Sequence, residues 1–399
     1  MQKKLLLWGA VCRPTTLPRL AKMLIAVLVL QVAIADNSRG MGASEAHQLS
    51  VIKTIQLEGP VNAVAFSRDG QHLAVLSDFG RSLVGVSTTN FEINSRIQRL
   101  GGGYSGNSLA FVSGNSVITS TPVGDYGRDP RYAQSPLIDK QFPRNDIFAL
   151  MEWDITRGKR VQYFPSPDRG VIPGIHYSDT FAVSRDGTLV AAIQTENVLV
   201  FNSATARIVQ TITTDDQPVS VAFGRDDDLA VGTIAGNVVL VHARTGKTDH
   251  QFQAYPYADY SVHALAFSSD GAFLATGKYT NSDRRRINGK WVIRQHNPTI
   301  MKVWTASGQL VATLSEPPML LGGDDAPNVY AVAWHGSTVA VGTSASLTVW
   351  KINSHQAIPI ANRHLSNGAY TLSYSPRGML AVGSGSEIFL TSETDGSFN

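Results

Sequence analysis

A three-residue pattern occurs seven times along this chain of 399 residues, and it limits what the chain can fold into. Each copy consists of an apolar residue, a small residue and a large apolar residue. The copies are Val64-Ala65-Phe66, Leu109-Ala110-Phe111, Phe181-Ala182-Val183, Val221-Ala222-Phe223, Leu265-Ala266-Phe267, Val332-Ala333-Trp334 and Leu372-Ser373-Tyr374. Alternation of this kind indicates a strand with one bulky face and one face that needs a small group. We therefore expect seven equivalent strands that are packed closely together.

The residues after each copy also repeat. Three copies lead into turns with Asp and Gly at matching positions, Ser67-Arg68-Asp69-Gly70, Ser184-Arg185-Asp186-Gly187 and Ser268-Ser269-Asp270-Gly271. In such turns Asp accepts hydrogen bonds from nearby backbone, and Gly adopts the positive φ angle. Second strands are predicted at 72–76, 229–232, 273–276, 339–342 and 380–383, third strands at 198–201, 238–241, 301–304 and 347–350, and fourth strands at 207–212 and 309–314. Each repeat is thus predicted to be a sheet of four antiparallel strands.

The spacing of the copies supports one sheet per repeat. Their small middle residues lie 45, 72, 40, 44, 67 and 40 residues apart. Four intervals match the ~40–45 residues of a propeller blade. The two long intervals indicate inserts at about 121–147 and 279–299.

A resemblance to a known protein family becomes specific at the third strands. Glu152-Trp153-Asp154 contains a Trp-Asp dipeptide, and Trp304 and Trp350 occupy the corresponding position. From residue 49 to about 397 the chain resembles the WD-repeat β-propeller family. The resemblance implies an all-β, seven-bladed propeller of four-stranded antiparallel blades, in a family whose members usually serve assembly. The Gly-His dipeptide of that family is missing from this sequence, so its His–Asp hydrogen-bond network is not implied.

The two ends of the repeat region predict how the ring closes. The last copy is followed by only two further strands, so the last blade has three strands at 370–374, 379–383 and 387–391. The segment before the first copy, 49–57, contains Val51–Ile55, which resembles the fourth strand Ile208–Ile212. We expect this N-terminal strand to complete the last blade, because closure removes exposed strand edges.

The first 35 residues resemble a secretory signal peptide. They hold Lys and Arg but no acidic residue, and an apolar run, Met23–Ala35, ends in the small-x-small pattern of Ala33 and Ala35. This run has 13 residues, whereas a membrane span needs about 20. We expect a signal peptide at 1–35, a short linker at 36–48 and the propeller at 49–399. An uncleaved anchor, a transit peptide and a true start codon downstream of Met1 remain alternatives.

Removal of this leader changes the charge of the chain. The leader holds five of the 34 Lys and Arg residues and none of the 31 Asp and Glu residues. The mature chain keeps 29 basic and 31 acidic residues, a net charge of −2 against +3 for the whole chain. This balance does not favour nucleic acid as a partner. The single cysteine, Cys12, lies in the leader, so the mature chain is predicted to have neither a disulfide nor thiolate chemistry.

The inserts are the candidate contact surface. Each is expected between the second and third strands of its blade, blades two and five, so both project from one face of the ring. Long loops on a rigid scaffold often carry binding, and Arg with aromatic residues is the composition of interface hot spots. The candidate partner-binding residues are Tyr126, Arg128, Arg131, Tyr132, Tyr255, Tyr257, Arg284, Arg285, Arg286, Trp291 and Arg294. The alternative is that the inserts are merely solvated loops.

Common catalytic and metal-binding patterns are missing from the sequence. It has no Gly-x-Ser-x-Gly, no His-Glu-x-x-His and no phosphate-binding glycine loop, and its ten histidines lack metal-ligand spacing. Asp226–Asp228 resemble turn carboxylates more than a calcium loop. We therefore expect a non-enzymatic scaffold without cofactor or metal, exported to the periplasm or secreted, monomeric by itself, without stable membrane insertion, and bound to another protein.

Two other function classes remain open. The first is a propeller enzyme, such as a lactonase-like hydrolase, with its site at the mouth of the central channel. The second is a propeller that binds a small molecule or a glycan through aromatic loops.

Overall fold

The computed structural model describes residues 47–98, 100, 108–121, 149–165, 180–194, 196–256, 260–280, 284–287, 290–293, 299–315, 328–353 and 356–392. The expected leader lies outside these ranges, as does most of the expected linker. Within them, no helix is long and apolar enough to span a membrane.

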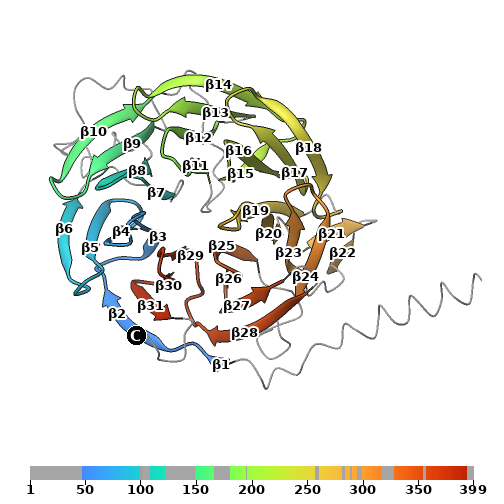
Figure 1. Ribbon diagram of the computed structural model, residues 1–399. Helices are drawn as coiled ribbons and strands as arrows, with labels where there is room; N and C mark the ends of the chain where they lie inside the picture. Colours follow the sequence, from blue (N-terminus) through green and yellow to red (C-terminus); the bar gives the residue numbers. More distant parts are fainter. Residues whose placement is uncertain are drawn as a thin grey trace, which may run out of the picture. The chain divides into compact units, whose positions relative to one another are not determined.

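Seven sheets form a ring, and the first strand of each sheet lies nearest its centre (Figure 1). Blade one contains β3 (Val61–Phe66), β4 (His72–Ser77), β5 (Ser82–Ser87) and β6 (Ile93–Gln98). Blade two contains β7 (Leu109–Ser113), β8 (Ser116–Thr121), β9 (Ala149–Asp154) and β10 (Lys159–Phe164). Blade three contains β11 (Phe181–Val183), β12 (Leu189–Gln194), β13 (Asn197–Asn202) and β14 (Arg207–Thr213). Blade four contains β15 (Pro218–Phe223), β16 (Asp228–Thr233), β17 (Asn237–His242) and β18 (Lys247–Gln253).

The remaining blades complete the ring. Blade five contains β19 (Tyr260–Phe267), β20 (Phe273–Thr280), β23 (Thr299–Thr305) and β24 (Leu310–Ser315). Blade six contains β25 (Val329–His335), β26 (Thr338–Thr343), β27 (Ser346–Ile352) and β28 (Ala357–His364). Blade seven contains β29 (Thr371–Tyr374), β30 (Met379–Ser384), β31 (Glu387–Ser392) and, from the start of the chain, β2 (Val51–Gln56). The fold is the predicted seven-bladed β-propeller of four-stranded antiparallel blades.

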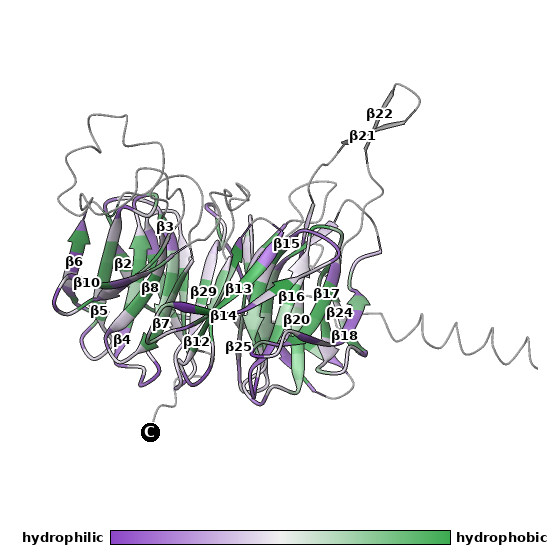
Figure 2. Ribbon diagram, turned by 90° about the horizontal axis from the view of Figure 1, so that it is seen from above, coloured by the Kyte–Doolittle hydropathy of each residue, from purple (hydrophilic) through white to green (hydrophobic). Residues whose placement is uncertain are grey.

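The recurring pattern explains how neighbouring blades pack. All seven copies lie in first strands, as predicted. In blade one, Ala65 pairs with Ala74 of the second strand, and this small face packs against Phe111 and Val117 of blade two. Small residues therefore make room for the bulky face of the next blade. Figure 2 shows apolar character concentrated along the strands and hydrophilic residues at the turns.

The Trp residues of the third strands link to second strands. Trp153 Nε1 donates a hydrogen bond to Thr119 Oγ1 at 3.1 Å, and Trp304 Nε1 donates to Thr276 Oγ1 at 3.0 Å. In blade six Trp350 pairs with Val339, and the position equivalent to Thr276 is Val341, which offers no acceptor. Among the described residues, the buried Trp350 Nε1 has no hydrogen-bond partner.

Closure of the ring follows the sequence prediction and adds one feature. β2 pairs antiparallel with β31, with Gln56 opposite Glu387, so the N-terminal strand completes blade seven. In addition, β1 (His47–Gln48) pairs in parallel with β28 and makes blade six five-stranded. Leu49, between β1 and β2, is buried against residues of blades six and seven. The segment from β1 to β2 therefore connects two blades rather than one.

The two longest connections between second and third strands follow β8 and β20. Residues 122–148 follow β8 and precede β9, and residues 281–298 follow β20 and precede β23. The second insert includes a two-stranded sheet of β21 (Arg284–Ile287) and β22 (Lys290–Ile293).

Candidate functional site

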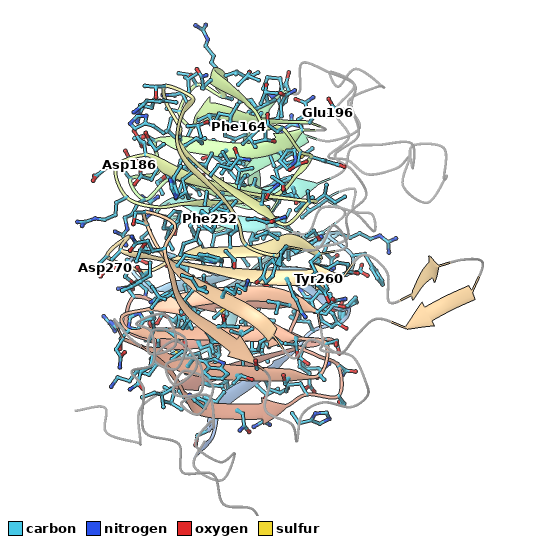
Figure 3. All side chains as sticks on the ribbon, turned by 90° about the vertical axis from the view of Figure 1, so that its right-hand side faces the viewer. Phe164, Asp186, Glu196, Phe252, Tyr260 and Asp270 are labelled. Atoms are coloured by element: carbon cyan, nitrogen blue, oxygen red, sulfur yellow. The ribbon has the colours of Figure 1, made fainter. Side chains whose placement is uncertain are left out.

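The two ends of the ring carry different connections. Turns from first to second strands lie at one end, which we call the turn face and which includes Asp186 and Asp270. Connections from second to third strands, and those that enter the first strands, lie at the other end, which we call the insert face. Figure 3 shows Asp186 and Asp270 at one end and Glu196 and Tyr260 at the other. Each insert connects the second and third strands of one blade and therefore begins and ends at the insert face.

The side chains of most sequence-predicted contact residues lie outside the part of the chain that the structure describes. Tyr126, Arg128, Arg131, Tyr132, Tyr257 and Arg294 lie outside the described residues. The backbone of Arg284, Arg285 and Arg286 forms β21, and that of Trp291 belongs to β22. The predicted contact surface therefore remains a prediction for these ten residues.

Tyr255 is the one candidate whose side chain is described, and it is buried. Only 2% of its surface is exposed, and it packs with Val262 and Leu274 between blades four and five. Its hydroxyl donates a hydrogen bond to the Thr276 carbonyl at 2.6 Å, and burial raises the pKa of the phenol. The ring therefore belongs to the packing between blades rather than to an exposed surface.

A different set of side chains gathers where first strands begin on the insert face. In blades one, four, five and six the pairing of the first and second strands skips one residue there, a β-bulge. The skipped residues are Asn62, Val219, His263 and Tyr330. In blade seven, Tyr370 occupies the same position, and its N–H donates to the Gly383 carbonyl at 3.1 Å. Because a bulge re-aims its side chain, these residues break the alternation of the strand.

Glycine opposite the bulges brings four pairs of blades close together. The residues concerned are Gly232, Gly277, Gly342 and Gly383, in the second strands of blades four to seven. A Cβ at Gly277 would lie 2.4 Å from Val329 Cγ1 of the next blade, and one at Gly342 would lie 2.4 Å from the Ala369 carbonyl oxygen. Any side chain would therefore push the next blade away. The equivalent residues of blades one to three are Leu76, Ser120 and Ile193.

The close approach joins aromatic rings from three successive blades. Tyr279 of blade five lies 6.1 Å from Tyr330 of blade six, and Tyr330 lies 4.7 Å from Tyr370 of blade seven, measured between ring centroids. We call these three residues the tyrosine ledge. The exposed fraction of Tyr370 is 38%, while Tyr279 and Tyr330 are half-buried. On the other side of Tyr279, the His263 ring lies at 4.5 Å.

The ledge is an uncharged surface supported by a buried histidine. His263 is 3% exposed, and burial lowers its pKa to about 4, so the imidazole is neutral at pH 7. The nearby Lys278 is 1% exposed, with its Nζ 4.9 Å from the centroid of the Tyr260 ring. Tyrosine phenols can both donate and accept hydrogen bonds. The ledge therefore combines aromatic rings and phenol groups from three blades.

The sequence contains a signal for the ledge that lies outside the inserts. Tyr330 and Tyr370 each stand two positions before a copy of the repeated pattern, and so does His263. An aromatic residue two positions before the pattern looks like part of the predicted strand, so the sequence alone does not mark it as a surface residue.

The turn carboxylates serve the fold. Burial by itself raises the pKa of Asp186, but hydrogen bonds from the Ser184 hydroxyl and from Thr188 outweigh it and lower the pKa to about 2. Asp69 and Asp270 cap their own turns in the same way. Within the described ranges, no group of three or more His, Cys, Asp and Glu side chains is placed to hold a metal ion.

Comparison with known proteins identifies the type of fold. No protein-family model matches the chain, and no curated protein does. Among solved structures, the chain is similar to that of U3-55K, a WD40 protein, with a TM-score of 0.61 over 88% of this chain and 100% of that chain. The fold is a WD40-like β-propeller. Sequence identity to U3-55K is 14%, so this likeness concerns the fold alone.

Proposed function

We propose that this WD40-like propeller is a non-enzymatic scaffold that acts outside the cytoplasm and holds a partner protein on its insert face. One observation carries the proposal, the tyrosine ledge across blades five, six and seven. Tyrosine is enriched in interface hot spots because it supplies a large, rigid contact area and a polar group. The WD40-like fold is typical of interaction scaffolds, which supports the same class of function.

The two inserts belong to the same proposal. Both begin and end at the insert face, and the second follows β20, the strand that carries Tyr279. In this proposal a partner on the ledge also contacts the hairpin of β21 and β22, whose sequence adds the positive charges of Arg284, Arg285 and Arg286 and the aromatic ring of Trp291.

Capture of partners by variant proteins tests the scaffold. We would compare proteins retained from the envelope fraction of the source cells by the wild type, by Tyr330→Ala/Tyr370→Ala and by Arg284, Arg285, Arg286 and Trp291 changed together to Ser. Tyr163→Ala is the matched control, because Tyr163 is similarly exposed, at 42%, but lies on the outer strand β10. We expect a partner that the wild type and the control retain and that at least one of the other variants loses. If all four proteins retain the same set, the insert face is not the interface.

Export rests on the N-terminal sequence pattern alone. If the leader is cleaved after Ala35, Edman sequencing of the mature protein begins at Asp36. A mature protein that begins at Met1 would contradict cleavage and would favour the anchored or the non-exported alternative.

A hydrolase site at the channel mouth finds little support in the bulge residues. Asn62 Oδ1 already accepts a hydrogen bond from the Gly80 N–H at 3.1 Å, and His263 is buried. The other described bulge positions hold Val219 and two tyrosines. General acid–base catalysis most often uses a histidine, and the histidine among these residues is buried.

The glycan-binding alternative keeps one favourable observation, because sugars also stack on aromatic rings. A thermal-shift screen of sugars against the wild type and Tyr370→Ala separates it from the scaffold. A saturable shift by one sugar that is lost in the variant would favour glycan binding.

A further inference from the structure

We propose that the edge of β21 that faces away from β22 accepts an extended, acidic segment of the partner protein as a third strand. The inference rests on the proposed function, because it assigns a chemistry to one part of the partner that the scaffold would hold. It follows from the pairing of the two strands, from the distribution of charge between them and from an edge pairing elsewhere in the chain.

The sheet of β21 and β22 has two strands. The two strands pair antiparallel, and neither of them pairs with any other strand that the structure describes. A two-stranded sheet by itself is only marginally stable in water, and a third strand with further burial is needed for independent stability. A strand added along β21 would therefore stabilise the hairpin while it bound the partner through main-chain hydrogen bonds.

Charge in this sheet is divided between the strands rather than between the faces. Residues that lie directly opposite each other in an antiparallel pair share a face. Each of the four pairs combines one basic and one apolar residue. The pairs are Arg284 with Ile293, Arg285 with Val292, Arg286 with Trp291 and Ile287 with Lys290. β21 contributes three of these four basic residues, so its edge is the basic edge of the sheet.

This distribution does not suit a lipid surface. Segments that lie on a membrane bury an apolar face and carry their basic residues on the opposite face. Here one face of the sheet carries Arg284 and Arg286, and the other carries Arg285 and Lys290. A strand that pairs along the edge of β21 lies beside both faces at once, so it meets three consecutive basic residues.

The three arginines define the chemistry of the added strand. Residues opposite each other in neighbouring strands stabilise the pair when their charges are opposite and destabilise it when the charges are alike. Consecutive Asp or Glu residues would lie opposite Arg284, Arg285 and Arg286, and the guanidinium group is suited to carboxylates. A second copy of β21 does not fit, because it would bring arginines against arginines.

The chain already contains an edge pairing of a similar kind. β1 joins the outer edge of β28 in parallel, with His47 opposite Ala361 and Gln48 opposite Asn362. The outer strand of blade six therefore accepts a short extended segment from outside its own repeat. The hairpin offers a second edge, within an insert that begins and ends at the insert face.

Binding of a fluorescein-labelled peptide to the full chain, followed by fluorescence anisotropy, tests the proposal. The peptide is Thr-Val-Glu-Glu-Glu-Val-Thr, and we expect saturable binding that weakens as salt is raised. Replacement of its glutamates by glutamine should weaken binding by about tenfold or more. N-methylation of its backbone nitrogens keeps the charge but removes the N–H donors that strand pairing requires, so it should also weaken binding by about tenfold or more.

Variants of β21 locate the site. Arg284→Ser/Arg285→Ser/Arg286→Ser should bind the glutamate peptide about tenfold or more weakly than the wild type does. Arg284→Glu/Arg285→Glu/Arg286→Glu should reverse the preference, toward a peptide with lysine in place of each glutamate. Because the charge reversal is expected to gain binding, it keeps the test valid if the serine variant loses the hairpin.

Lys159→Ser/Arg207→Ser/Lys351→Ser is the matched control, because it removes three exposed positive charges from blades two, three and six. It should bind the glutamate peptide as the wild type does. Equal loss in this control would show that net charge rather than β21 attracts the peptide, and that result would overturn the inference.

Three further results would also overturn it. The first is the absence of saturable binding by wild-type protein with a normal melting curve. The second is equal binding of the N-methylated peptide, because attraction would then occur without strand pairing. The third is binding to phosphatidylglycerol vesicles that depends on the three arginines while the peptide does not bind, since this would assign the hairpin to a lipid surface.

Failure of the inference is distinguishable from failure of the scaffold. If partner capture depends on the insert face but the glutamate peptide does not bind, the scaffold stands and the acidic third strand is wrong. If the peptide binds at β21 but no captured protein depends on the insert face, the preference of the edge stands and the scaffold proposal fails.

Discussion

Blades four to seven differ from blades one to three in how closely neighbouring blades approach. In blades four to seven a second-strand glycine faces the next blade, and we call this part the glycine half. In blades one to three the same position holds Leu76, Ser120 or Ile193, and the first strands of neighbouring blades are in less extensive contact. One missing side chain thus changes the distance between blades while the four-stranded pattern stays the same.

The difference has a consequence at the surface. Rings from blades five, six and seven touch one another on the insert face only because the strands that carry them are close. A wider spacing would separate the same tyrosines into single exposed rings. The packing of the glycine half and the candidate binding site therefore depend on the same contacts.

The largest expected effect comes from removing β2, the strand that completes blade seven in the glycine half. Deletion of 49–58 removes β2 together with the buried Leu49, Ile55 and Leu57, and it exposes the edge of β31. Loss of this apolar burial should lower the melting temperature by roughly 10 °C or more, or cause aggregation through the free edge. Thermal melting followed by circular dichroism measures the effect. A chain that begins at His47 is the control, and an unchanged melting curve of the deletion would refute closure by β2.

Adding a side chain in the glycine half and removing one at the equivalent position of blades one to three distinguish the two kinds of contact between blades. Gly342→Ala should cost about 3 kcal/mol, because the new methyl group meets the Ala369 backbone and overpacking of this kind is poorly relieved. Ile193→Ala should cost about 2–5 kcal/mol for the opposite reason, since it leaves a cavity. Denaturant unfolding gives both free energies.

Gly114→Ala is the control for the glycine substitution. Gly114 has a φ of 44°, but no heavy atom lies within 4 Å of the position that a Cβ would take there, so only backbone strain of about 1 kcal/mol is expected. If Gly342→Ala is no more harmful than Gly114→Ala, close approach of the blades is not what requires glycine.

The pH dependence of stability sharpens the comparison at His263. The pKa of this buried imidazole is lowered from 6.5 to about 4, so between these values the unfolded chain binds a proton that the folded chain does not. Stability from this group is complete above pH 6.5 and is lost as the pH falls toward 4, by roughly 2–3 kcal/mol. The free energy of unfolding, measured from pH 7 to 4, gives the slope.

His263→Phe serves as the control for this window. Phenylalanine keeps a ring against Tyr279 but cannot be protonated, so the slope between pH 6.5 and 4 should flatten. Loss of stability below pH 4 should remain, because the pKa of Asp186 is lowered to about 2 and its turn contacts are lost only as the pH falls through that range. An unchanged slope in His263→Phe would assign the acid sensitivity to other groups.

The smallest effect concerns a difference within the glycine half. Blade five has the Thr276–Trp304 hydrogen bond, whereas blade six has Val341 at the position equivalent to Thr276. Val341→Thr should add about 1 kcal/mol of stability by giving the Trp350 N–H an acceptor. Thr276→Val should remove about 1–2 kcal/mol by leaving the Trp304 N–H without one. Denaturant midpoints measure both changes, and effects of the same sign would contradict this account.

The repeated units could be predicted because their signals are local. The apolar–small–apolar pattern located all seven first strands, and the Asp-Gly turns located second strands such as β4 and β20. The resemblance of 51–55 to a fourth strand located β2 and hence the closure of the ring. Periodicity and turn chemistry belong to short stretches of sequence, and here they agree with the global fold.

The candidate site could not be predicted in the same way. The sequence analysis favoured the inserts and Tyr255, but Tyr255 is buried between blades four and five. The ledge combines Tyr279, Tyr330 and Tyr370, which are 51 and 40 residues apart in the chain. Their meeting depends on bulges that redirect side chains and on the distance between blades, and neither leaves a strong local pattern.

By itself the sequence determined the number of blades, the order of their strands and the strand that closes the ring, because alternation and turn residues fix these within each repeat. The tertiary structure decided which blades come close, which side chains leave the alternation and where rings from different blades meet. These outcomes depend on the space between sheets, and that space is set by single atoms, such as the Cβ that Gly277 and Gly342 lack. The same glycines look like ordinary strand residues when the sequence is considered one repeat at a time.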